Sequence, residues 1–218
     1  QSPTGEVYVL AEARIAMIPG ATSKGKGGKK AVLSDNWKVL KNIAGKDLED
    51  LKYKPLFSYY EREMVNAFRV CTDGYVTDIS GTGVVHQAPA YGEDDFRVCL
   101  DNNIILKDGT LPDPVDANGC FTFPLPIPIL GMHVKAADKE IINLVKNENR
   151  LIESSSIKHS YPYCWRSRTP LIYKAVASYF VRVEDLKEKL LINNSQTRWV
   201  PSYVQEKRFH NWLENAHE

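Results

Sequence analysis

One histidine and three carboxylates lie close together in residues 81–99, in a pattern typical of a strand, a tight turn and a helix. Val84 and Val85 are β-branched and favour a short strand, and His86 stands at the exit of that strand. A Pro and a Gly then break the chain before the acidic run 93–95, which should form the first turn of a helix. Acidic side chains are favoured at that end of a helix, so the charge pattern supports this boundary.

His86 and Asp95 are the candidate functional side chains, because the turn between them is short enough for both to face one small cavity. A carboxylate held at a helix N-terminus should stay ionised, which suits binding of an ammonium group better than general-base catalysis. We therefore expect Asp95 to anchor a positively charged group. Spacing alone leaves structural roles open, since acidic residues often cap helices and a histidine at a strand end often only makes hydrogen bonds.

The same stretch resembles a known family. Residues 81–89 (GTGVVHQAP) and 92–96 (GEDDF) closely resemble the editing, or proofreading, domain of isoleucyl-tRNA synthetases, particularly the eukaryotic cytosolic type. In related editing domains the valyl enzymes tend to carry Lys and the leucyl enzymes Thr where His86 stands, while all share an Asp at the position of Asp95. The histidine therefore points to the isoleucyl branch, and His86 and Ala88 disfavour the threonine editing of the valyl branch.

Further segments resemble the same family in the same order. They are residues 51–57 (LKYKPLF), 114–116 (PVD) with Gly119 and Phe121, 159–167 (HSYPYCWRS), 169–176 (TPLIYKAV) and 208–213 (RFHNWL). The last of these resembles the segment that leads back to the catalytic core of the synthetase. Several separate motifs in one order argue against coincidence.

The resemblance implies hydrolysis of valine misattached to tRNA(Ile), with valyl-adenylate as a further substrate left open. Asp95 would pair with the α-ammonium group of the valine, and the bulk of His86 would refuse the extra methylene of isoleucine. A general-base role for His86 is the less favoured alternative, since related domains work with Lys or Thr there. The remaining residues implied to bind substrate are Gly81, Thr82, Gly83, Ala88 and Gly92.

Water is the implied nucleophile, and no metal or organic cofactor is expected in this domain. ATP and magnesium are expected only at the synthetic site of a full-length enzyme, because the chain has neither a His-Ile-Gly-His nor a Lys-Met-Ser-Lys-Ser type motif. The threonine-rich segment that forms the other wall of the family's editing pocket is also missing from this sequence. We therefore expect a fragment, with an editing core at residues 1–158 and a return segment at 159–218. A non-catalytic tRNA-binding or docking module is the alternative.

Composition fits a cytoplasmic enzyme that acts without a membrane. Hydrophobic residues make up 43% and charged residues 25%, which is ordinary for a globular protein, and no apolar run is long enough to span a bilayer. The net charge of +1 gives no overall attraction to nucleic acid, so RNA contacts would need a local patch. The four cysteines are widely spaced and indicate neither a zinc site nor a disulfide framework. The expected partners are the 3′ end of tRNA(Ile) and the catalytic core of the same synthetase, and we expect a monomer.

The predicted fold class is α+β, with a β-barrel-like core of short mixed strands and flanking helices. Residues 21–31, rich in Lys and Gly, are predicted to be a mobile loop. The aromatic stretch 161–180, with interleaved Arg and Lys, could stack a base, but strands that join the domain to its parent are favoured. The predicted strands are 6–10, 12–18, 37–43, 67–71, 75–79 and 83–86, and the predicted helices are 93–102, 135–149, 184–193 and one after Pro201 with Phe209, Trp212, Leu213 and Ala216 as its packing face.

Overall fold

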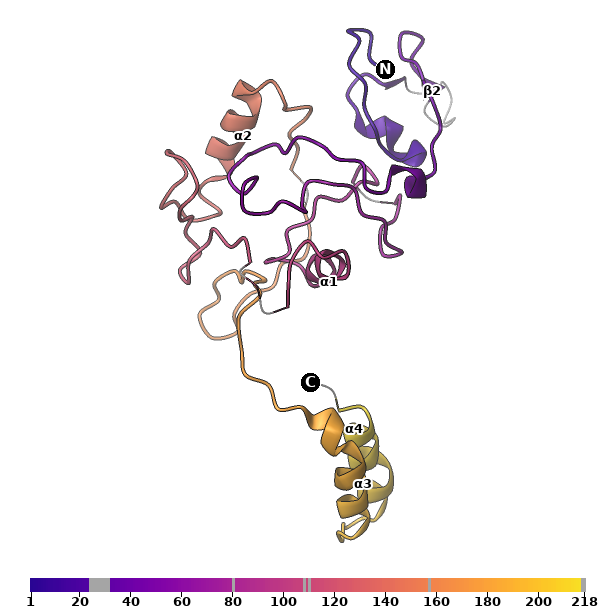
Figure 1. Cartoon of the computed structure of the whole chain (residues 1–218), viewed down its shortest axis with the longest axis vertical. Coiled ribbons are helices and arrows are strands. Elements are labelled where there is room, and N and C mark those ends of the chain that lie inside the picture. Colours follow the sequence, from indigo (N-terminus) through magenta and orange to yellow (C-terminus); the bar gives the residue numbers. More distant parts are fainter. Residues whose placement is uncertain (24–31, 80, 108, 110, 157, 217–218) are drawn as a thin grey trace. The chain divides into compact units, whose positions relative to one another are not determined.

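The computed structural model describes residues 1–23, 32–79, 81–107, 109, 111–156 and 158–216 (Figure 1). These residues form two compact units, 1–175 and 176–218, and each is described by itself. The predicted domain boundary at 158/159 falls inside the first unit and stays a prediction. Most of the predicted Lys- and Gly-rich loop, residues 24–31, lies outside the described residues.

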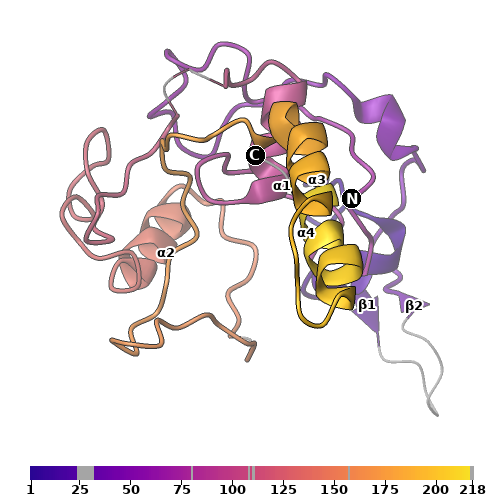
Figure 2. The ribbon, with the colours of Figure 1, turned by 90° about the horizontal axis from the view of Figure 1, so that it is seen from below.

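The first unit consists of short elements joined by long loops. Its two strands pair antiparallel, with Thr22 opposite Leu33 and Ser23 opposite Val32 (Figure 2). No other strand is assigned in the part of this unit that the structure describes, so the barrel-like core stays a prediction. Its elements are the 3-10 helices η1 (Glu12–Met17) and η2 (Gly45–Leu48), the strands β1 (Thr22–Ser23) and β2 (Val32–Leu33), and the α-helices α1 (Glu93–Asp101) and α2 (Asp138–Asn147).

The strand predicted at 12–18 is wrong, because residues 12–17 form the helix η1. Ala13, Ala16 and Met17 favour a helix, and Glu12 suits its first turn. The helical turn brings the side chain of Arg14 to backbone carbonyls of residues 79 and 81. This contact ties η1 to the glycine-rich turn ahead of His86.

Of the predicted strands, 67–71 shows ladder-like pairing with residues 50–53. Lys52 and Arg69 form an antiparallel bridge. The backbone N–H of Tyr53 donates to the carbonyl of Phe68 at 2.9 Å, and the N–H of Val70 donates to Leu51 at 3.0 Å. This paired segment leads directly into the loop at residues 73–75, which contacts α1.

Eight apolar residues are buried in the described part of the first unit, and two of them belong to α1. The helix buries Val98 and Cys99 and leaves Glu93 and Asp94 of its acidic first turn exposed. Two predicted helices are confirmed, α1 with nearly the expected bounds and α2 inside the expected range 135–149. The helix α2 ends early because Asn149, which follows its C-cap, is left-handed with a φ of 55°. The buried apolar residues are Ala21, Ala90, Val98, Cys99, Ile105, Val115, Ile129 and Ala137.

The second unit is a small helical assembly in which α3 and α4 lie side by side (Figures 1 and 2). The amide of Asn194 donates to the carbonyl of Gln205 at 3.1 Å, and the amide of Gln205 donates back to Asn194 at 2.6 Å. Within the predicted apolar stripe, Leu213 is buried whereas Trp212 is 66% exposed. The elements are η3 (Val183–Leu186), α3 (Lys187–Ser195), the π-helix η4 (Val204–Phe209) and α4 (His210–Glu214).

None of the helices in the described part of the chain combines the length and apolarity needed to cross a bilayer.

Candidate functional site

The carboxylate of Asp95 is held at the first turn of α1 and folds back over the preceding turn. Its Oδ2 accepts a hydrogen bond from the backbone N–H of Ala88 at 3.1 Å, and its Oδ1 accepts one from the hydroxyl of Tyr75 at 3.4 Å. The side chain is half-buried. Ala88, predicted to bind substrate, thus acts on the site through its backbone.

Gly92 makes room for this arrangement. A Cβ atom at position 92 would lie 2.7 Å from Oδ2 of Asp95, closer than side-chain carbons pack. The backbone of Gly92 is extended, with a φ of −150°, so the requirement for glycine comes from space and not from conformation. In this structure the predicted substrate-binding Gly92 therefore serves the position of Asp95.

His86 is exposed, and no hydrogen bond, ion pair or ring contact joins it to another described residue. In particular, no hydrogen bond or ion pair joins His86 to Asp95. The expectation that both side chains face one cavity therefore stays a prediction. A general base is usually oriented by a third group, and none of the described residues does this for His86.

The glycine-rich turn ahead of His86 is fixed by the N-terminal segment. The N–H of Ala11 donates to the carbonyl of Thr82 at 2.8 Å, and the guanidinium of Arg14 donates to the carbonyl of Gly81 at 2.7 Å. The hydroxyl of Thr82 donates to the carbonyl of Val84 at 3.1 Å, so it is used within the turn. Gly81 and Gly83 both have positive φ, which glycine adopts without strain.

Replacing Gly83 by Ala should destabilise the fold more than replacing Gly81 by Ala. Both positions carry the cost of a left-handed residue, roughly 1–2 kcal/mol, but a Cβ at 83 would also clash with Cβ of Ala11, whereas one at 81 meets nothing within 4 Å. Overpacking adds about 1–3 kcal/mol, so we expect a total loss of about 2–5 kcal/mol for G83A. Urea unfolding of both variants measures the difference, and equal losses would contradict the packing of Gly83 on Ala11.

A hydrogen-bonded network that sequence reasoning missed supports Asp95. The amide of Gln87 donates to the hydroxyl of Tyr75 at 3.0 Å, and that hydroxyl donates to Asp95. The thiol of Cys99 donates to the amide oxygen of Gln87 at 3.8 Å, and burial raises the pKa of this thiol to about 11. Gln87 stood inside the family-like string, but nothing in the sequence singled out Tyr75.

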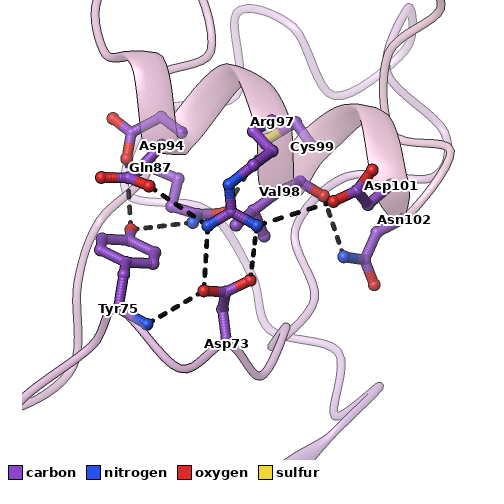
Figure 3. Close-up of polar contacts among 10 residues, drawn as sticks. Asp73, Tyr75, Gln87, Asp94, Arg97, Val98, Cys99, Asp101 and Asn102 are labelled. Atoms are coloured by element: carbon purple, nitrogen blue, oxygen red, sulfur yellow. Dashed lines mark hydrogen bonds and ion pairs between the residues drawn. The ribbon is translucent and has the colours of Figure 1, made fainter.

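A charged cluster on the outer side of α1 holds the loop that carries Tyr75 (Figure 3). The guanidinium of Arg97 donates to both oxygens of Asp73, at 2.9 and 3.0 Å, and also contacts Asp94 at 3.2 Å and Asp101 at 3.6 Å. The Arg97 hydrogen bonds, followed by the backbone N–H of Tyr75, lower the pKa of Asp73 to about 2. The fork between Asp73 and Arg97 thus fixes Tyr75 against the first turns of the helix.

This ion pair predicts a loss of stability in acid. The pKa of Asp73 is about 2 in the folded chain and about 4 when unfolded, so its contribution is complete above pH 4 and disappears as the pH falls toward 2. Urea unfolding between pH 2 and 5 should show the free energy of unfolding falling with pH, and less steeply in Asp73→Asn. Asp94→Asn, which leaves the fork intact, is the matched control. An unchanged slope in Asp73→Asn would contradict this role of the fork.

No group of three or more His, Cys, Asp or Glu side chains placed to hold a metal ion occurs among the residues that the structure describes. Asp94, Asp73 and Asp101 share the cation Arg97, but no Lys, Arg or His of the described chain lies within ion-pair distance of Asp95. A carboxylate has about four lone-pair sites, and two on Asp95 are occupied. The site can therefore accept hydrogen bonds from a cationic ligand such as an ammonium group.

Comparison with known proteins gives a consistent result along the chain. Residues 25–218 match the model of the family described as tRNA synthetases class I (I, L, M and V). The chain is 51% identical to the cytoplasmic isoleucine–tRNA ligase of Arabidopsis thaliana and 48% identical to that of Caenorhabditis elegans, in each case over 99% of this chain. It is 47% identical to the cytoplasmic enzyme of Mus musculus over 98% of this chain. The chain spans 19%, 18% and 16% of these relatives.

Proposed function

The chain belongs to the class I tRNA synthetases (I, L, M and V), and we propose that it is the editing domain of an isoleucine–tRNA ligase. In this proposal it hydrolyses the ester of valine misattached to tRNA(Ile), giving free valine and a tRNA that can be charged again. The relatives named above are cytoplasmic isoleucine–tRNA ligases, and their names support both the amino acid and a cytoplasmic location.

The observation that carries the proposal is the unpaired carboxylate of Asp95. It is half-buried, fixed by Ala88 and Tyr75, and has no cationic partner among the described residues, unlike Asp73 and Asp94. An aminoacyl ester presents an α-ammonium group beside the bond that must be cut. A charge-assisted contact between the two would hold the ester in one orientation for attack by water.

Discrimination against isoleucine requires a second criterion, because Asp95 contacts a group that all amino acids share. One methylene changes binding in a hydrophobic pocket by only ~1–3 kcal/mol, a figure established on isoleucyl-tRNA synthetases themselves and not obtained from this structure. A site that excludes the larger side chain reverses the preference of the synthetic site. We assign this exclusion to His86, whose exposed imidazole has no orienting partner among the described residues and is thus better suited to a steric role than to proton transfer.

The aminoacylation activity of a whole ligase is proposed for the full-length protein and not for this chain. Amino-acid activation with ATP and magnesium would take place at a synthetic site elsewhere in the ligase. The catalytic core and the 3′ end of tRNA(Ile) would be the partners of this domain, and the ligase is proposed to act as a monomer.

A non-catalytic tRNA-docking module is the second candidate, and it is favoured because no hydrogen bond or ion pair joins His86 to Asp95. The two functions differ in turnover. We propose to measure deacylation of valyl-tRNA(Ile) by the chain and by a chimeric ligase, in which the chain replaces the matching segment of the Mus musculus enzyme. Hydrolysis above the spontaneous rate by the chimeric ligase supports editing. Binding of tRNA without hydrolysis by both proteins would support the docking module and contradict the proposed function.

A further inference from the structure

A cavity of about 420 Å³ opens in the first unit beside the start of α1. Its size falls within the range of ligand sites, roughly 300–1,000 Å³. Four of its nine lining residues are aromatic. Its two charged residues are Asp138, the first residue of α2, and Lys135, which precedes that helix. The lining residues are Tyr91, Val115, Phe121, Val134, Lys135, Asp138, Tyr161, Ile172 and Tyr173.

The walls of this cavity are built by two hairpin-like segments. Val115 and Phe121 form an antiparallel bridge across a turn that Asp116 stabilises by accepting two backbone N–H groups at 2.8 Å. At Gly119 an added Cβ would lie 2.9 Å from Cδ1 of Ile172, so the turn packs closely on the second segment. That segment, residues 161–173, is closed by the bridge between Tyr163 and Pro170 and by three backbone hydrogen bonds.

The polar groups around Tyr91 satisfy one another and leave its ring to the cavity. Its hydroxyl donates to Oδ1 of Asp113 at 2.6 Å, and the ammonium of Lys174 lies 2.8 Å from Oδ2 of the same residue. Burial acts to raise the pKa of Asp113, but hydrogen bonds from Lys174, Tyr91 and the backbone N–H of Val115 outweigh it and lower the pKa. The ion pair of Asp113 and Lys174 therefore contributes no net charge to the cavity.

The second segment is rich in positive charge. Residues 154–175 contain four Lys or Arg and no Asp or Glu, and of these four Lys174 is paired with Asp113. The ammonium of Lys135 lies 4.5 Å from the centre of the Tyr161 ring, and the guanidinium of Arg166 lies 4.8 Å from that of Trp165. Neither cation forms an ion pair with a described residue. Aromatic rings interleaved with free cations are the combination that binds single-stranded nucleic acid, by stacking bases and contacting phosphates.

The cavity is joined to the first turns of α1. The hydroxyl of Tyr173 donates to Oε2 of Glu93 at 3.3 Å, and the N–H of Ala175 donates to the carbonyl of Ala90 at 2.8 Å. Tyr91 itself precedes Gly92 and the helix that carries Asp95. The cavity therefore lies next to the first turn of the helix that carries Asp95.

We propose that the cavity binds one unpaired nucleobase of the RNA 3′ tail, next to the nucleotide that carries the amino acid. The base stacks on Tyr161, Lys135 contacts its phosphate, and the carboxylate of Asp138 accepts a hydrogen bond from an exocyclic amino group. This site rests on the proposed function, because that function brings an RNA 3′ end to α1. An apolar protein segment from the rest of a synthetase is the competing occupant.

Binding of a fluorescein-labelled RNA hexamer ending in CCA to the 218-residue chain, followed by fluorescence anisotropy, tests the proposal. Tyr161→Ala should weaken binding about tenfold, the lower part of the range for one base stacked on an aromatic ring, whereas Tyr161→Phe should keep it. Lys135→Gln replaces an exposed side chain and should reduce the slope of log K against log salt by about 0.7. The matched control is Phe123→Ala, since Phe123 is 84% exposed, belongs to the same loop as Phe121 and does not line the cavity.

Three outcomes would overturn the cavity as an RNA site: no binding of the hexamer by the chain, an unchanged salt slope in Lys135→Gln, or equal weakening by Phe123→Ala. The first would leave the cavity to a protein segment. Hydrolysis that survives in the absence of hexamer binding would reject the cavity alone, and hexamer binding without hydrolysis would reject the editing function alone.

Discussion

Replacing Asp95 by Ala is expected to lower the rate of valyl-tRNA(Ile) hydrolysis by the chimeric ligase about 100-fold or more, with the fold retained. The carboxylate of Asp95 is the proposed anchor of the α-ammonium group, and loss of orientation of an ester by about 1 Å costs on the order of 100-fold. The fold should persist because Asp95 accepts only two hydrogen bonds, both at least 3.1 Å long, and is half-buried.

Asp94→Ala is the matched control for this change. Asp94 is the neighbouring carboxylate, but it is exposed and directed to Arg97, so its loss should leave hydrolysis within a few-fold of the wild type. Single-turnover deacylation separates the two variants, and circular dichroism verifies the fold. Unchanged turnover in Asp95→Ala would remove Asp95 from the mechanism.

Replacing His86 by Ala should turn correctly charged isoleucyl-tRNA(Ile) into a substrate. If the imidazole excludes the extra methylene of isoleucine, its removal should raise hydrolysis of the isoleucyl ester about 10- to 200-fold, the equivalent of ~1–3 kcal/mol. Hydrolysis of the valyl ester should remain within a few-fold of the wild type, because His86 contacts no described group that it would have to orient. The ratio of the two deacylation rates is the quantity to measure.

The competing role of His86 gives the opposite result. Loss of a general base lowers hydrolysis of both esters, typically by 100- to 10,000-fold, and leaves their ratio unchanged. A fall of that size for both substrates in His86→Ala would contradict the steric role. His86→Asn, which keeps a polar side chain of smaller volume, should lie between the wild type and His86→Ala.

Local signals in the sequence predicted the helix that carries the site. The acidic run after Gly92 and the Pro before it defined the start of α1, and the helix follows with nearly the expected bounds. Local structure could therefore be predicted from the sequence, including the position of Asp95 in the first turn of α1. The strand predictions covered short segments, where helix propensity also acts, and at Glu12–Met17 the helix propensity prevailed.

Long-range partners could not be read from the sequence. Asp73 and Arg97 are 24 residues apart and Tyr75 and Asp95 are 20 apart, and neither pair shares an element or a periodic pattern. The same holds for Gly83, whose neighbour Ala11 belongs to the N-terminal segment. The substrate-binding roles predicted for the glycines and Ala88 remain proposals. The structural reasons for the glycines, which are space for Asp95 at Gly92 and close packing of the turn at Gly83, became visible only in three dimensions.

The most direct test of the editing function is misacylation by the chimeric ligase supplied with ATP, valine and tRNA(Ile). A ligase with an active editing domain destroys valyl-tRNA(Ile) as it forms, so the chimeric ligase should accumulate almost none, while its Asp95→Ala variant should accumulate it steadily. Charging with isoleucine should be equal in the two proteins. Equal accumulation of valyl-tRNA(Ile) with and without Asp95 would contradict the assignment of this chain as the editing domain.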